Sequence, residues 1–217
     1  MNENDAHALS DVAYGLFEVF LNRELHGRGH YLFERVEQEV DFSVEFSEIF
    51  AMFSEEYPQL AGALTERFGA EDTLYKMIGA GEGIIPSCTT QMFWIVQDAP
   101  EVLPVDIDDE RAGKWLIFVD KPDADRLWAQ IRDATVAGNL GTSAKVSTAK
   151  ENPDSRDKRS VIYVFTADWS DEAGVMAVRE TLRSFGVEQR IGYKRNIETY
   201  HGEYSDETGK KVTYYSA

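Results

Sequence analysis

Small hydroxyl residues surround a lysine in one segment of this chain, Leu140-Gly141-Thr142-Ser143-Ala144-Lys145-Val146-Ser147-Thr148. Backbone N–H groups, hydroxyls and an ammonium are the groups that bind an anionic oxygen. The segment therefore predicts a phosphate-binding site made by Ser143, Lys145, Ser147 and Thr148. The alternative is an ordinary loop and strand in which the Lys145 ammonium extends into solvent, as in most charged runs.

Further cations follow in the sequence, at Arg159, Arg190 and Lys194. If the strands that carry them are neighbours of the strand around Lys145, these side chains form a local basic patch on an acidic protein. We therefore expect all three to bind the same phosphorylated ligand as Lys145.

The sequence patterns of the common cofactor and metal sites are missing. There is no dinucleotide fingerprint and no phosphate-loop sequence. His26 and His30 have the spacing of metal ligands on a helix, but Gly27 and Gly29 interrupt that helix, and nothing has zinc-ligand spacing. We therefore expect neither a cofactor nor a bound metal.

The four tryptophans are candidates for stacking on a flat ligand such as a base. Trp94, Trp115 and Trp128 are flanked by apolar residues at core periodicity, which favours packing in the core. Trp169 lies between a predicted strand and a predicted helix, so it is the tryptophan that we expect to be exposed.

The composition of the 217 residues excludes several classes of protein. The single cysteine, Cys88, cannot form an internal disulfide. No apolar run approaches the roughly 20 residues of a membrane helix, and the polar, acidic N-terminus is unlike a signal peptide. We therefore expect a cytoplasmic protein that does not enter a membrane.

The net charge of −17 is unevenly distributed. Residues 1–110 carry 23 acidic and 5 basic side chains, whereas residues 111–217 carry 16 acidic and 17 basic ones. Nonspecific binding of nucleic acid by the whole chain is disfavoured, because a negative body repels phosphate. The acidic part is explained by helices with solvated outer faces, or by a surface that binds a basic protein partner.

Hydrophobic periodicity divides the chain into two regions. The first region predicts amphipathic helices at 6–25, 42–54, 58–68 and 71–78, and leaves 31–40 ambiguous between helix and strand. The second region predicts strands at 92–96, 114–119, 143–148, 161–166, 188–194, 197–204 and 211–215, with helices at 123–136 and 171–185, the latter capped by Ser170.

This order of elements predicts an α+β fold with helices on one face of a mainly antiparallel sheet. The corresponding domains are an acidic helical region at 1–90 and a sheet domain at 91–217, unless the two form one continuous globular unit.

The blocks of the second region resemble the uncharacterised family of the basophilic leukaemia expressed protein (Bles). They are Gly113-Lys114-Trp115-Leu116-Ile117-Phe118, Leu127-Trp128, the 140–148 segment, Val161-Ile162-Tyr163-Val164-Phe165-Thr166, Tyr193-Lys194 and Thr199-Tyr200. The resemblance covers about residues 110–204. One departure is Asn196, where the family pattern leads us to expect an acidic residue after Tyr193-Lys194.

The resemblance implies a fold like that of the cap-binding translation initiation factor, a curved antiparallel sheet backed by helices. Similar proteins are also described as phosphothreonine-lyase-like, which would make Lys145 the base, Arg190 or Lys194 the phosphate clamp and His201 the acid. Because fold alone does not determine function, three functions stay open. They are binding of a nucleotide or RNA end near Lys145, elimination on a phosphate ester, and protein interaction through the acidic helices.

Overall fold

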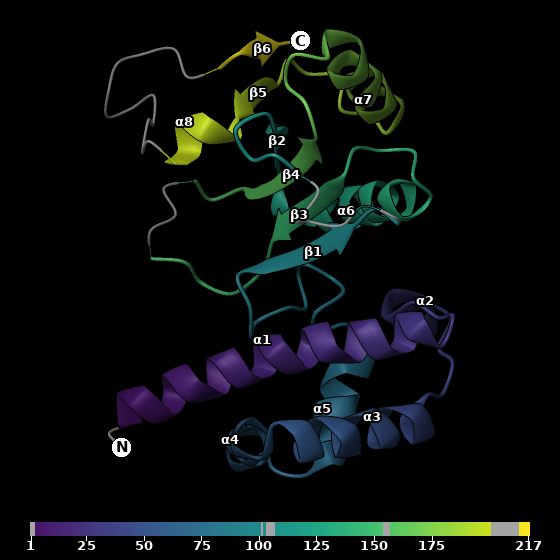
Figure 1. Cartoon of the computed structure of the whole chain (residues 1–217), viewed down its shortest axis with the longest axis vertical. Helices are drawn as coiled ribbons and strands as arrows, with labels where there is room; N and C mark the ends of the chain where they lie inside the picture. The colour runs from purple at the N-terminus through teal and green to yellow at the C-terminus, as the bar shows by residue number, and fades with distance from the viewer. Residues whose placement is uncertain (1–2, 101, 103–106, 154–156, 201–212) are drawn as a thin grey trace. The chain divides into compact units, whose positions relative to one another are not determined.

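The computed structural model describes residues 3–100, 102, 107–153, 157–200 and 213–217 (Figure 1). The chain folds into two compact units. The helical unit comprises residues 1–93 with 148–152, and the sheet unit comprises residues 94–147 with 153–217. Each unit is described by itself below.

The helical unit contains five described helices, α1 (Glu3–Gly27), α2 (Leu32–Glu37), α3 (Ser43–Glu56), α4 (Pro58–Phe68) and α5 (Glu71–Gly79). The four helices predicted from periodicity are confirmed, and the ambiguous segment 31–40 contains the short helix α2. Pro58 begins α4 because proline is compatible with the first helical turn. Gly69 follows the end of α4 with a φ of +81°, a conformation that glycine adopts without strain.

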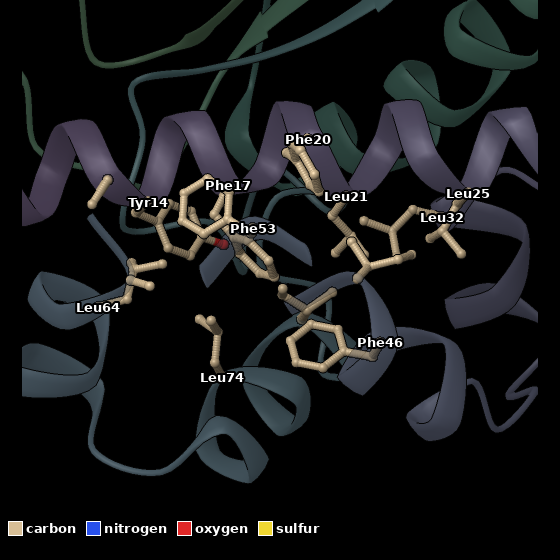
Figure 2. Packing of buried hydrophobic residues seen from close by; sticks show 14 of the residues in the cluster. Tyr14, Phe17, Phe20, Leu21, Leu25, Leu32, Phe46, Phe53, Leu64 and Leu74 are labelled. Carbon is tan, nitrogen blue, oxygen red and sulfur yellow. The ribbon is translucent and has the colours of Figure 1, made fainter. Parts of the chain in front are cut away.

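Aromatic rings make up much of the core of the helical unit (Figure 2). The Phe17 ring of α1 meets the rings of Phe46, Phe50 and Phe53 on α3 edge-to-face, with centroids 5.6, 5.4 and 5.2 Å away. Such edge-to-face pairs stabilise the fold beyond the apolar area that they bury. Figure 2 shows Leu64 of α4 and Leu74 of α5 directed into the same cluster, so one core joins α1 to the helices that follow.

The sheet unit contains six described strands, β1 (Trp94–Asp98), β2 (Gly113–Val119), β3 (Ser143–Ser147), β4 (Ser160–Thr166), β5 (Gly192–Arg195) and β6 (Tyr215–Ser216). Their order in the sheet is β1-β3-β4-β2-β5-β6, and every neighbouring pair is antiparallel. Three helices accompany the strands, α6 (Lys121–Val136), α7 (Glu172–Ser184) and α8 (Asn196–Tyr200). The predicted α+β fold with a curved antiparallel sheet is confirmed (Figure 1).

Side chains alternate between the two faces of this sheet, as strand geometry requires. The face toward α6 and α7 is apolar and buried, and the Trp115 indole N–H there donates to the Val175 carbonyl of α7 over 3.1 Å. The opposite face, which we call the lysine face, carries a mixture of rings, hydroxyls and ammonium groups. Its residues are Trp94, Val96, Asp98, Lys114, Leu116, Phe118, Ser143, Lys145, Ser147, Val161, Tyr163, Phe165 and Lys194, so one carboxylate, that of Asp98, also lies on this face.

Two sequence predictions near the helix ends are wrong. The predicted strand at 197–204 is, over its described part, the helix α8, because the Glu198 carboxylate accepts hydrogen bonds from the Arg195 backbone N–H and guanidinium and closes a helical turn. The helix at 171–185 is capped by Asp171 and not by the predicted Ser170, because the Asp171 carboxylate accepts from the Gly174 N–H. The Ser170 hydroxyl instead donates to Asp168, so it is not available to the helix.

Candidate functional site

Lys145 lies on the lysine face with its ammonium above three aromatic rings. Its Nζ is 4.3 Å from the ring centroid of Trp94, 5.2 Å from that of Tyr163 and 5.9 Å from that of Phe165. The register explains this position, because Lys145 pairs with Val96 on β1 and with Tyr163 on β4. A cation at such distances is attracted by the negative faces of the rings. Burial lowers the pKa of Lys145, since desolvation disfavours the charged amine.

Lys114 brings a second ammonium to the same rings from β2. Its Nζ is 5.5 Å from the Phe165 centroid and 5.8 Å from the Tyr163 centroid, and it donates a 3.0 Å hydrogen bond to Asn196 Oδ1. The pKa of Lys114 is lowered to about 8, first by burial and then by the charges of Lys145 and Lys194, while Asp109 acts in the opposite direction.

Lys194 completes a group of three that we call the lysine cluster, Lys114, Lys145 and Lys194. Lys194 lies directly opposite Lys114 in the pairing of β2 with β5. Like charges at opposed positions of an antiparallel pair destabilise the pair. The lysine cluster is therefore a local concentration of positive charge in a sheet unit whose other charged side chains are of both signs.

The three rings beneath these ammonium groups form what we call the aromatic floor, Trp94, Tyr163 and Phe165. The Trp94 and Tyr163 rings are stacked with centroids 5.3 Å apart and planes at 30°, and the Phe165 ring meets Tyr163 edge-on at 6.3 Å. The predicted core position of Trp94 is wrong, because alternation along β1 buries Ile95 and turns the half-buried Trp94 to the lysine face. Trp115 and Trp128 are buried as predicted, and Trp169 is half-buried.

The hydroxyl residues of the predicted site are divided between the two units. Ser143 and Ser147 alternate with Lys145 on β3 and share its face, and the Ser147 hydroxyl accepts a 2.9 Å hydrogen bond from the Val161 N–H. Thr148 lies in the helical unit, where its N–H donates to the Phe93 carbonyl and its hydroxyl to the Met92 carbonyl.

Arg159 and Arg190 lie away from the lysine cluster. Arg159 pairs with Asp157 and rests 5.0 Å above the Phe118 ring, and it precedes Tyr163 by four residues, about 13 Å along a strand. It borders a cavity of about 360 Å³ between β2, α6 and the end of α7. Arg190 donates to the Ser216 hydroxyl over 2.8 Å and precedes Lys194 by the same spacing. Both guanidinium groups therefore lie near the starts of β4 and β5, away from the strand positions that carry the lysine cluster.

The remaining predictions concern His201 and metal binding. His201 lies outside the described residues, so its proposed role as an acid stays a prediction. Within the described ranges, no group of three or more histidine, cysteine, aspartate or glutamate side chains is arranged to hold a metal ion. No described helix is both long and apolar enough to cross a membrane.

Sequence reasoning missed Lys114, Tyr163, Phe165 and Asn196 as members of the site. One usable signal was present, since Lys114 and Lys194 are cations within apolar or aromatic strand blocks. Such a lysine must either extend to the edge of the sheet or share a face with other polar groups.

Solved structures of eIF4E proteins match part of this chain. The schistosome eIF4E complexed with m7GpppA and 4E-BP is 17% identical with a TM-score of 0.40, and the match covers 52% of this chain and 66% of that one. The C. elegans eIF4E-3 complexed with the 4E-binding protein Mextli and cap analog is 18% identical with a TM-score of 0.38, covering 47% and 61%. The Ascaris suum eIF4E-3 with m2,2,7G cap is 19% identical with a TM-score of 0.36, covering 54% and 64%. This chain thus spans less than two thirds of each of these proteins.

A family model matches the sheet unit more specifically. It is described as "Basophilic leukemia-expressed protein Bles03" and covers residues 109–202. The matched range includes Lys114, Lys145 and Lys194 but begins after Trp94. The resemblance seen in the sequence blocks is thereby confirmed, since residues 109–202 match the model of this family.

Proposed function

We propose that the lysine face binds a ligand that combines a flat ring with an anionic group, such as a nucleotide or a phosphorylated RNA end. The ring would stack on the aromatic floor and the phosphate would lie against the lysine cluster. Stacking of a base on an aromatic side chain contributes about 1–3 kcal/mol. Ammonium groups contribute charge-assisted hydrogen bonds to phosphate oxygens.

One observation carries this proposal. The Lys145 ammonium lies 4.3 Å above the Trp94 ring, and among the described residues no carboxylate forms an ion pair with it. Lys114 and Lys194 lie at opposed positions of the β2–β5 pair, and the charges of Lys145 and Lys194 act on Lys114, so this cluster attracts an anion.

Calorimetric titration of the full chain with GTP, ATP and inorganic phosphate tests the proposal. Nucleotides should bind more tightly than phosphate alone, because only they stack on the floor. Lys145→Ala should weaken nucleotide binding about tenfold, or about 1.4 kcal/mol, and Trp94→Leu should remove the advantage of nucleotides over phosphate.

Lys121→Ala is the matched control, since Lys121 is an exposed lysine at the start of α6. Far-ultraviolet circular dichroism should confirm that all three variants fold. Equal nucleotide affinity in the Lys145→Ala, Lys121→Ala and unaltered proteins would refute a site on the lysine face.

Elimination on a phosphate ester is a second candidate, favoured by the lowered pKa of Lys145. A neutral Lys145 amine would remove a proton from the carbon adjacent to the ester carbon. The C–O bond would then break, leaving an alkene and inorganic phosphate. Incubation with a phosphothreonine peptide should release phosphate and yield the dehydrated peptide. Lys145→Arg should abolish turnover while keeping peptide binding, and absence of any dehydrated product from the unaltered protein would exclude this activity.

A further inference from the structure

Lys114 has the surroundings of a nucleophilic amine. The residue is only 8% exposed, and its ammonium donates to the neutral amide oxygen of Asn196. Lys194 lies directly across the strand pair, and Lys145 approaches the same Tyr163 and Phe165 rings from β3. Burial and the neighbouring cations outweigh the opposing charge of Asp109 and favour the uncharged amine, which is the form that attacks a carbonyl carbon.

We propose that Lys114 forms an imine with an aldehyde or ketone that also carries a phosphate or carboxylate group. The inference rests on the proposed function, since the lysine face must hold the anionic group. Lys145 and Lys194 would bind that group, and the Phe165 ring, 5.5 Å from Lys114 Nζ, would pack against the carbon skeleton.

The step balances without an oxidant or reductant. The Lys114 lone pair forms a C–N bond to the carbonyl carbon, and the carbonyl π electrons move to oxygen, which takes up a proton as the nitrogen releases one. A further proton from solvent then converts the hydroxyl into water, which leaves as the nitrogen lone pair forms the C=N bond. The protonated imine keeps one N–H, which the Asn196 amide oxygen can still accept.

Reductive trapping of the full chain with pyridoxal 5′-phosphate and borohydride tests this inference. Peptide mass spectrometry should find the adduct at Lys114 at a level about tenfold or more above that at Lys121, because the less basic amine is far more often neutral at pH 7.4. Excess inorganic phosphate should suppress the Lys114 adduct by competing for Lys145 and Lys194. Pyridoxal without phosphate should react more slowly at Lys114 and equally at Lys121.

Lys114→Arg separates the two proposals, because arginine keeps the positive charge but forms no imine under these conditions. The variant should lose the Lys114 adduct and still bind nucleotide, and Lys121→Arg should behave as the unaltered protein in both assays. An adduct spread evenly over exposed lysines, or one found at Lys145 and not Lys114, would overturn the inference. Nucleotide affinity measured on the same samples decides the proposed function independently.

Discussion

The ammonium of Lys114 donates a 3.0 Å hydrogen bond to the side-chain oxygen of Asn196. The other side of the same amide donates to Asp109 Oδ1 over 3.4 Å. Asn196 occupies the position where the family resemblance predicts an acid, and a carboxylate there would neutralise Lys114. An amide satisfies the hydrogen bond without adding negative charge, so the lysine cluster keeps its positive potential.

Asn196→Asp should therefore convert an anion site into an internal ion pair. The new carboxylate raises the pKa of Lys114 and offsets its charge, so phosphate and nucleotide affinity should fall about fivefold. Calorimetric titration measures the change. Asn139→Asp, which adds the same charge at an exposed position after α6, should leave affinity unaltered, and equal losses in both variants would indicate a nonspecific charge effect.

Anion affinity should depend on pH near the pKa of Lys114, which is about 8. Below that pH the ammonium is charged and attracts phosphate, and above it the amine is neutral. Affinity for inorganic phosphate should therefore fall by about fivefold as pH rises from 7.5 to 9. Titrations across this range should show the fall in the unaltered protein and not in Lys114→Arg. A parallel fall in both proteins would assign the titration to another group.

The lowered pKa of Lys114 also affects the stability of the fold. Anion affinity falls as pH rises, whereas the free energy of unfolding increases. Between about pH 8 and the ordinary lysine value of 10.5, the unfolded chain keeps a proton that the folded chain has lost. The contribution of Lys114 to the free energy of unfolding should thus rise with pH through this window. Urea denaturation at pH 7 and 9.5 should show that the free energy of unfolding of the unaltered protein, relative to that of Lys114→Met, is higher at pH 9.5 than at pH 7.

Gly141 should tolerate no side chain. Its φ is +60°, and a Cβ there would overlap the backbone carbonyl oxygen of Phe165. Gly138 has a similar φ of +71° but open space around it, so it isolates the cost of backbone strain. Gly141→Ala should lower the free energy of unfolding by about 1–3 kcal/mol more than Gly138→Ala does. Urea denaturation followed by circular dichroism measures both, and equal losses would contradict the predicted overlap.

Phe17 should be among the most sensitive positions of the helical unit. Its ring is fully buried and touches three rings of α3. Phe17→Ala should cost about 3–5 kcal/mol of unfolding free energy, because the cavity cannot close around rigid rings. Val44→Ala on α3, where the side chain is 72% exposed, should cost less than about 0.5 kcal/mol. Thermal unfolding of both variants checks the contrast.

The helices could be predicted because hydrophobic periodicity is a local property of sequence. The segment from Pro58 to Phe68 has both boundary signals within it and forms α4 as predicted. The helix α8 was missed because it depends on Glu198 binding the Arg195 backbone N–H and guanidinium, and aromatic residues nearby resemble a strand pattern.

The site was only partly predictable, because the hydrophobic periodicity of a single strand does not predict which strands lie beside it in the sheet. Lys145 was singled out by its own neighbours in sequence. Lys114 belongs to the site because of its contact with Asn196, 82 residues later, and because Lys194 lies opposite it on β5. Arg159 and Arg190 had the right charge but lie at the wrong end of their strands, which only the register of pairing reveals.

Because Lys145 lies above Trp94, the fluorescence of Trp94 depends on the state of the Lys145 amine. A unit charge 4.3 Å from the centre of an indole ring acts on its excited state through a short, weakly screened path. The wavelength of maximum emission of Trp94 should therefore shift when that amine loses its proton or moves away from the ring. Trp115 and Trp128 are sealed in the interior, where neither event reaches them directly. In a variant that lacks Trp169, which lies under Arg195, the emission of Trp94 would report the state of Lys145 without any label attached to the chain.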